Sequence, residues 1–354
     1  MTPTDLNGIF PPITTPFIDD NVAYDKLASN IKKWGQTGLK GFVVLGSNGE
    51  YVSLSEEEKR QVVETVVQAA PDHMSIIAGT GCESTRETIR LTADCAALGA
   101  HAALVVSPHY FGGKMTETAL VNHYTAIADS SAIPIILYNV PKFTHVNLGV
   151  NIVARLSQHP NIIGIKDSTG NVIQLGEYLN RVDTNFSVLV GTAGALFGGL
   201  TLGCAGGVLA LANVAPEECV RIHELVQEGD YKAARQIQLK MIPVNQAVTA
   251  TYGVAGLKTA LELRGYFGGD PRAPLMPSSD DEKTAIVNIL KEAGLLSWYW
   301  RTRQVFSRPE FVTCLPAFQV VSKITMIGTF HDGLCPLKSE SRIKSPCKRL
   351  VAAA

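Results

Sequence analysis

Charged residues are scarce in this sequence of 354 residues. Only 18% of the residues are charged, and 31 Lys and Arg nearly balance 32 Asp and Glu, which leaves a net charge of -1. That balance gives no electrostatic reason to expect nucleic acid or an anionic membrane as a partner. Because 46% of the residues are hydrophobic, the chain can bury a large core, and a disordered or collagen-like chain is excluded.

Cysteines and targeting signals are scarce as well. The seven cysteines contain no CxxC pair and no zinc-finger cluster, which favours incidental thiols in a reducing compartment over a disulfide framework. The N-terminal MTPTDLNGIFPP has no basic start followed by an apolar run, and no Arg-rich amphipathic segment. These absences predict a cytoplasmic protein, with a mitochondrial location left open.

The longest uncharged stretch runs from Thr184 to Pro216, and a bilayer can be crossed by about 20 residues. This stretch contains seven glycines, however, and divides into the two β-like runs FSVLVGT and GGVLALA. A buried strand–helix–strand unit explains that pattern better than a membrane span does. No membrane partner is predicted.

Short apolar runs alternate with longer amphipathic segments along most of the chain. Because the runs are apolar throughout, they are typical of parallel strands buried on both faces. The eight predicted strands are 8–17, 41–47, 74–81, 102–108, 133–140, 162–168, 186–192 and 206–212. Eight strand–helix repeats predict an α/β fold, the (β/α)8 TIM barrel with a C-terminal helical extension. A doubly wound sheet is the alternative, but it usually has fewer strands and often a glycine-rich phosphate loop.

The chain divides into three predicted parts: a barrel core at 1–214, a helical domain at 215–296 and a tail at 297–354. Two S-x-x-E patterns, Ser53–Glu56 and Ser84–Glu87, predict helix N-termini within the barrel. The tail carries nine Lys and Arg but three Asp and Glu, a net charge of +6. It is interpreted as a loosely ordered extension or a translated non-homologous segment, in preference to a basic interaction tail.

Lys166 is the sharpest candidate for chemistry. Active sites of TIM barrels form at the carboxyl ends of the strands, and Lys166 follows the apolar run IIGI near the end of its strand. Burial favours the free amine of a lysine, and a free amine can form a Schiff base with a ketone. The alternatives are a lysine that reaches solvent at the barrel mouth, or one paired with Asp167.

Other strand ends offer partners for such a lysine. Tyr138 could move a proton between substrate and enzyme, and Ser47 and Tyr110 could extend that relay. The backbone amides of Ser47 and Asn48, in a glycine-flanked turn, could hold a carboxylate. The eight His include no HExxH or H-x-x-x-H pair, and carboxylates do not cluster at strand ends. Neither a metal nor a cofactor is predicted.

Three motifs together resemble a known group of enzymes. GSNGE at 46–50, YNVP at 138–141 and IKDS at 165–168 resemble the dihydrodipicolinate synthase / N-acetylneuraminate lyase superfamily of class I aldolases, over about residues 6–296. Further segments are similar to mitochondrial-type 4-hydroxy-2-oxoglutarate aldolase, namely AGTGCEST at 78–85, LSQHPNI at 156–162, ALANV at 210–214 and RAPL at 272–275.

The resemblance implies a TIM barrel with C-terminal helices that assembles as a homotetramer or homodimer and forms an imine with pyruvate. By position, Lys166 matches the Schiff-base lysine and Tyr138 the acid/base tyrosine. Ser47 and Tyr110 match the proton relay, with Tyr110 reaching across a subunit contact. The resemblance thus implies a small 2-keto acid as the substrate.

The same comparison suggests the residues that contact the substrate. Ser47 and Asn48 match the residues that bind the pyruvoyl carboxylate, and Gly191 and Thr192 match the residues that line the pocket near the cleaved bond. Dihydrodipicolinate synthases usually have Arg two residues after the Pro of YNVP, where this chain has Phe143. An aromatic ring makes no bidentate contact with a carboxylate.

The leading prediction is therefore a class I aldolase that cleaves 4-hydroxy-2-oxoglutarate to pyruvate and glyoxylate. The alternatives within the superfamily are a dihydrodipicolinate synthase, a 2-keto-3-deoxy sugar acid aldolase and an aromatic hydratase-aldolase. A sensor that uses the imine only to bind a keto acid is the alternative outside enzymes. The presence of Tyr138, Ser47 and Tyr110 together with Lys166 argues against it, because a pure binding protein needs no proton relay.

Overall fold

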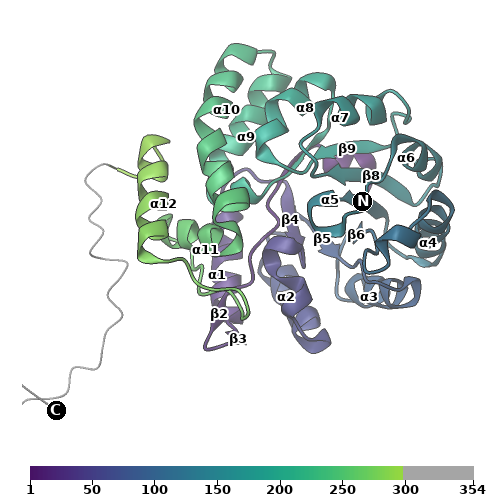
Figure 1. Ribbon diagram of the computed structural model, residues 1–354, viewed down its shortest axis with the longest axis horizontal. Coiled ribbons are helices and arrows are strands. Elements are labelled where there is room, and N and C mark those ends of the chain that lie inside the picture. Colours follow the sequence, from purple (N-terminus) through teal and green to yellow (C-terminus); the bar gives the residue numbers. More distant parts are fainter. Residues whose placement is uncertain (298–354) are drawn as a thin grey trace, which may run out of the picture. The chain divides into compact units, whose positions relative to one another are not determined.

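The computed structural model describes residues 1–297, and its centre is an eight-stranded parallel sheet (Figure 1). Its strands lie in the order β1-β10-β9-β8-β7-β6-β5-β4. They are β1 (Gly8–Phe10), β4 (Gly41–Val44), β5 (Ser75–Gly79), β6 (Ala102–Val106), β7 (Ile135–Asn139), β8 (Ile162–Asp167), β9 (Ser187–Val190) and β10 (Gly206–Val208). Each predicted run contains one of these strands, and the TIM barrel is confirmed.

The sheet closes on itself between its first and last strands. The backbone N–H of Val43 in β4 donates to the carbonyl oxygen of Pro11, just after β1, at 3.0 Å. The N–H of Ile13 donates in turn to the carbonyl oxygen of Val43, also at 3.0 Å. These bonds join the two edges, so the barrel presents one ring of strand ends.

The predicted strand 8–17 is too long. Strand β1 ends at Phe10, and the chain then passes through Pro11 and Pro12, which have no N–H to give to a ladder. Beyond them, β2 (Phe17–Ile18) and β3 (Asn21–Val22) pair as a small antiparallel hairpin.

Helices follow the strands around the outside of the barrel (Figure 1). The first eight are α1 (Tyr24–Trp34), α2 (Glu56–Ala69), α3 (Thr85–Ala97), α4 (Glu117–Ser130), α5 (Pro141–Thr144), α6 (Val150–Leu156), α7 (Val172–Leu179) and α8 (Leu196–Leu202). The predicted helical extension contains α9 (Pro216–Gln227), α10 (Tyr231–Gln246), a π-helical turn (Ala247–Thr251), α11 (Gly253–Leu263) and α12 (Asp280–Glu292). Helix α9 contacts α8 and β1. The division at residue 214 stays a prediction.

One helix start differs from its prediction. Ser53 belongs to a 3-10 turn (Tyr51–Ser53), and the N-cap of α2 is Ser55. The Ser55 Oγ accepts from the Glu58 N–H at 3.2 Å, and the Ser55 N–H donates to Glu58 Oε2 at 2.8 Å. The same reciprocal pattern therefore occurs two residues later than expected. Ser84 caps α3 as predicted.

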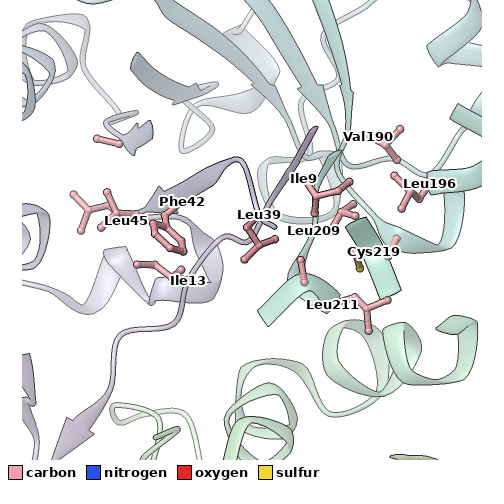
Figure 2. Packing of buried hydrophobic residues seen from close by; sticks show 14 of the residues in the cluster. Ile9, Ile13, Leu39, Phe42, Leu45, Val190, Leu196, Leu209, Leu211 and Cys219 are labelled. Atoms are coloured by element: carbon pink, nitrogen blue, oxygen red, sulfur yellow. The ribbon is translucent and has the colours of Figure 1, made fainter. Parts of the chain in front are cut away.

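Two hydrophobic clusters fill the molecule. The larger one lies between strands and helices, and Figure 2 shows members of it, among them Ile9, Leu209 and Cys219. The smaller one fills the barrel interior with residues from its strands, including Phe10, Val43 and Ile136. The interior is thus a packed core, and Tyr138 and Val140 are the members of this cluster nearest the carboxyl end of β7.

Within residues 1–297, no helix has both the length and the apolar character that a membrane crossing requires. The four cysteines of this part of the chain, at positions 82, 95, 204 and 219, are free thiols. The predicted tail lies outside the described residues apart from Ser297.

Candidate active site

The pairing of β7 with β8 places two candidate residues side by side. Tyr138 lies opposite Lys166, and the next pair along the strands is Asn139 with Asp167. Successive side chains of a strand point to opposite faces. Tyr138 belongs to the barrel interior, so Lys166 lies on the inner face, while Asn139 and Asp167 point toward the helices.

The Lys166 side chain is buried against the tyrosine. Its residue is only 4% exposed, and its Nζ lies 4.0 Å from the centroid of the Tyr138 ring. Lysine is rarely buried without a partner. Here the partner is a phenol ring, and no ion pair with a carboxylate is found for Lys166 among residues 1–297. The two alternatives, a solvent-reaching lysine and a pair with Asp167, are therefore wrong.

The Tyr138 hydroxyl lies among polar neighbours that favour its ionised form. Burial alone would raise the pKa of Tyr138, but the charge of Lys166 and hydrogen bonds with Ser47, Lys166 and Ser168 outweigh burial and lower this pKa. A phenol with a lowered pKa gives up its proton more readily, which is what a general acid/base requires. Ser168 was not among the predicted site residues, although it directly follows the Lys166–Asp167 pair.

The turn that carries Ser47 and Asn48 has an unusual backbone. A 3-10 turn (Ser47–Gly49) follows β4, and the residues on either side of the glycine-flanked segment, Leu45 and Glu50, have positive φ angles of 58° and 54°. Such conformations cost free energy for residues with a Cβ, and they persist where surrounding contacts enforce them. A Cβ at Gly79 would lie 2.2 Å from the Leu45 carbonyl oxygen, so β5 approaches this turn closely because residue 79 is glycine.

A small cavity lies at this end of the barrel, between β4, β5, β6 and β7. It is lined by Leu45, Gly46, Ser47, Tyr51, Gly79, Gly81, Leu104, Val106 and Tyr138. Tyr51 was not predicted to belong to the site. Burial, together with the nearby Tyr138, raises the pKa of Tyr51 to about 12, so this phenol keeps its proton. Its position directly after the GSNGE motif is the one signal in the sequence that points to it.

Behind the site, a polar network fixes the ends of β7 and β8. Asp167 accepts hydrogen bonds from Asn139 Nδ2 at 2.7 Å, Gln174 Nε2 at 3.0 Å and the Thr169 N–H at 3.0 Å. The Leu148 N–H donates to Asn139 Oδ1 at 2.9 Å. Because the carboxylate is already satisfied on the helix side, it does not compete for the lysine on the other face.

Gly191 and Thr192 follow β9, beside the end of β8. The Gly191 N–H donates to the Asp167 carbonyl oxygen at 2.6 Å, and a Cβ at position 191 would lie 2.1 Å from Ser168 Oγ. Glycine is therefore required for this close approach. Thr192 Oγ1 lies 3.5 Å from Asn245 Nδ2 of α10. Both residues lie at the expected end of the barrel, and their contact with a substrate stays a prediction.

Tyr110 is the predicted site residue that stands apart. It lies in the loop after β6, where Glu83 Oε2 accepts from the N–H groups of His109 and Tyr110 at 3.0 and 2.9 Å. Its side chain is 80% exposed and packs edge-on against Phe111, with ring centroids 5.0 Å apart. The Glu83 carboxylate thus fixes the loop backbone, while the Tyr110 ring projects outward. This geometry is consistent with a role of Tyr110 in the site of another copy of the chain. That role stays a prediction.

Metal ligands do not gather at this site: in the described part of the chain, no three His, Cys, Asp or Glu side chains are grouped closely enough to hold an ion. The site consists of an amine, a phenol, hydroxyls and backbone amides at the ends of neighbouring parallel strands. These groups can form an imine, transfer protons and bind a carboxylate.

Residues 5–293 match the model of the dihydrodipicolinate synthetase family. The chain belongs to this family. A 4-hydroxy-tetrahydrodipicolinate synthase of Methanothrix thermoacetophila is 38% identical over 294 residues, which cover 82% of this chain and 98% of the relative. The crystal structure of the dihydrodipicolinate synthase from Acinetobacter baumannii, complexed with pyruvate, matches with a TM-score of 0.78 and 32% identity, covering 82% of this chain and 99% of that one.

The family membership confirms the resemblance to the superfamily, and it makes the chain a class I aldolase-type lyase. A second relative, from Methanocaldococcus jannaschii, is 35% identical over 292 residues and is again named a 4-hydroxy-tetrahydrodipicolinate synthase. These names support the synthase alternative more than the leading prediction of a 4-hydroxy-2-oxoglutarate aldolase.

Proposed function

We propose that this enzyme joins pyruvate to an aldehyde, through an imine on Lys166, in a condensation of the 4-hydroxy-tetrahydrodipicolinate synthase type. The observation that carries the proposal is the buried Lys166 amine, with its Nζ 4.0 Å from the Tyr138 ring centroid. The names of the relatives support the reaction type. The pyruvate complex of the Acinetobacter baumannii synthase supports pyruvate as the shared substrate.

The chemistry follows from the groups present. The free amine of Lys166 attacks the C2 carbonyl of pyruvate, and loss of water leaves an iminium ion. The ionised Tyr138 hydroxyl removes a proton from C3 to give an enamine, whose C3 attacks the aldehyde carbon while the aldehyde oxygen takes up a proton. Tyr138 is the group placed to supply that proton, because its hydroxyl neighbours the lysine and its pKa is lowered. Hydrolysis of the imine then frees the product and restores the amine.

Other residues fill supporting roles in this proposal. The amides of Ser47 and Asn48, in the turn after β4, hold the carboxylate of pyruvate. Ser47 links Tyr138 to the relay, and Tyr110 of a second copy completes it, which makes a homodimer or homotetramer the working form. Gly191 and Thr192 form the wall beside the new bond.

Phe143 favours a second candidate reaction, the cleavage of 4-hydroxy-2-oxoglutarate to pyruvate and glyoxylate. Phe143 belongs to α5 and is 54% exposed, with Lys142 Nζ 5.6 Å from its ring centroid. The position therefore offers an aromatic surface and no guanidinium for a distal carboxylate. This cleavage is the reverse of a condensation of pyruvate with glyoxylate, so it uses the same imine and the same tyrosine.

The test has two stages. First, the enzyme is mixed with pyruvate and sodium borohydride, and peptide mass spectrometry locates the reduced adduct. We expect it on Lys166, and an enzyme that forms no adduct there would refute the imine. Second, consumption of pyruvate with aspartate semialdehyde is compared with pyruvate release from 4-hydroxy-2-oxoglutarate and from 2-keto-3-deoxygluconate.

Each outcome of the second stage assigns one reaction. Condensation alone supports the first candidate, and release from 4-hydroxy-2-oxoglutarate alone supports the second. Release mainly from 2-keto-3-deoxygluconate would overturn both in favour of sugar-acid cleavage. An adduct on Lys166 without turnover of any of these compounds would favour the keto-acid sensor.

A further inference from the structure

A second buried lysine lies far from Lys166 in the sequence. Lys258 is in the middle of α11, and its Nζ lies 2.6 Å from Glu50 Oε1, with side-chain exposures of 1% and 2%. Lys258 also donates to the Asp270 carbonyl oxygen at 3.0 Å and lies 4.4 Å from the Phe17 ring centroid. An ion pair so fully removed from water holds its two elements firmly, because breaking it leaves a charge unpaired inside the protein.

Glu50 is the residue that ends the turn of Ser47 and Asn48. It follows Gly49 directly and has the left-handed backbone conformation described above. Its second carboxylate oxygen accepts from the Arg272 N–H at 2.8 Å. Both oxygens of this side chain are thus held by C-terminal residues that follow the barrel by about fifty positions or more.

Arg272 ties this C-terminal segment to the barrel a second time. Its guanidinium donates to both carboxylate oxygens of Glu58, at 2.8 and 2.7 Å, and to the Ser53 carbonyl oxygen at 2.8 Å. On the other side of the turn, Thr15 Oγ1 donates to the Gly49 carbonyl oxygen at 2.7 Å. The turn is therefore anchored at its last two residues from both sides.

We propose that Glu50 and Lys258 are positioning residues, whose ion pair sets the geometry of the Ser47–Asn48 turn for binding the carboxylate of the 2-keto acid. Neither residue touches the reacting atoms in this scheme. The pair acts through the backbone, because a positive φ at Glu50 is kept only while its carboxylate is held in place. The inference rests on the proposed function insofar as the turn binds pyruvate.

The main test uses the double variant Glu50→Gln/Lys258→Met, which removes both charges and leaves no unpaired one. The matched control is Arg60→Met/Asp94→Asn, which removes an ion pair of the same 2.6 Å length from the surface between α2 and α3. Two readouts are compared: hydrogen–deuterium exchange of peptides covering residues 46–51, and the pyruvate concentration that half-saturates borohydride trapping on Lys166.

In the double variant we expect hydrogen–deuterium exchange at residues 46–51 to become about tenfold faster. The pyruvate concentration that half-saturates trapping should rise about tenfold or more, because small displacements of binding groups weaken binding steeply. The maximal extent of trapping should stay as in the wild type, because Lys166 is untouched. The control variant should match the wild type in both readouts.

Unchanged exchange and unchanged half-saturation in the folded double variant would overturn the inference, as would equal changes in the control. If the double variant does not fold, Glu50→Asp keeps both charges and shortens the side chain by one methylene, so no buried charge is left unpaired, and a smaller shift in the same direction is expected. If wild type forms no adduct with pyruvate, the proposed function fails, while the exchange readout still decides whether the pair positions the turn.

Discussion

Two lysines are buried within residues 1–297, and their surroundings differ. Lys166 lies near the end of strand β8 and against the Tyr138 ring, whereas Lys258 lies within α11 and contacts the carboxylate of Glu50. Burial lowers the pKa of Lys258, and the nearby Glu50 charge opposes that effect. Burial alone therefore does not single out the proposed nucleophile. The neighbours of each lysine distinguish the two sites. The amine of Lys258 is paired with the Glu50 carboxylate, whereas the amine of Lys166 lies against the Tyr138 phenol at the end of a strand.

The regions around Lys166 and Lys258 also contribute to different parts of the proposed site. The β7–β8 end holds the proposed nucleophile and acid/base, while residues of the C-terminal helices hold the turn that faces them from β4. A change at Lys166 should therefore affect chemistry more than stability, and a change at Lys258 should affect stability and binding more than chemistry. The predictions below test this division.

The largest effect is expected from Lys166→Arg. Arginine keeps the positive charge but cannot form an imine, so turnover should fall by about 10⁴-fold or more. Borohydride trapping with pyruvate should disappear, as measured by mass spectrometry. A variant that kept substantial activity would show that Lys166 serves only as a cation.

The next largest effect is expected on stability, from Lys258→Met. This substitution leaves the Glu50 carboxylate buried without its partner, which typically costs about 3–5 kcal/mol. The free energy of unfolding in urea measures it. The control Lys166→Met removes a buried amine that has no carboxylate partner, so its stability should equal or exceed that of the wild type. Equal losses in both variants would contradict the contrast between the two lysines.

A smaller effect is expected from Tyr138→Phe, which removes one hydroxyl from the barrel end. Loss of a general acid/base should lower kcat by about 10²-fold, because the lowered pKa of this tyrosine suits it to proton transfer. Steady-state kinetics and thermal unfolding measure the change, and the fold should persist. A variant with unchanged kcat would remove Tyr138 from the mechanism.

The smallest effect concerns acid stability around the C-terminal anchor. Hydrogen bonds from Arg272 lower the pKa of Glu58 from 4.5 to about 2. A depressed carboxyl pKa stabilises the folded state fully above the unfolded value, and this contribution is lost as the pH falls from about 4.5 to about 2. Urea unfolding across that range should therefore show a weaker pH dependence in Glu58→Gln than in the wild type. Parallel curves would exclude Glu58 as a source of the acid sensitivity.

Much of the barrel could be predicted because it depends on local pattern. Apolar runs without alternation predicted strands buried on both faces, and all eight are present. The predicted strand 8–17 was too long, because Pro11 and Pro12 interrupt the hydrogen-bond ladder after Phe10. The start of α2 was predicted two residues too early. A short 3-10 turn precedes the helix, and both Ser53 and Ser55 fit the capping pattern.

The site was predictable to the extent that strand ends meet in a barrel. Lys166 and Tyr138 were found because they lie near the carboxyl ends of strands, and parallel register brings such residues together. Ser168 and Tyr51 were missed because their residue types are common after strands and turns. Only the fold shows that one is hydrogen-bonded to Tyr138 and the other lines the cavity.

The sequence by itself determined the strand–helix order and the identity of the residues at the strand ends, because hydrophobic periodicity is a property of neighbouring residues. The tertiary structure decided which side of each strand those residues occupy and which distant groups hold them. The pair of Glu50 and Lys258 joins residues 208 positions apart. No local pattern relates them, since their attraction exists only after the C-terminal helices pack beside the turn and exclude water from both charges.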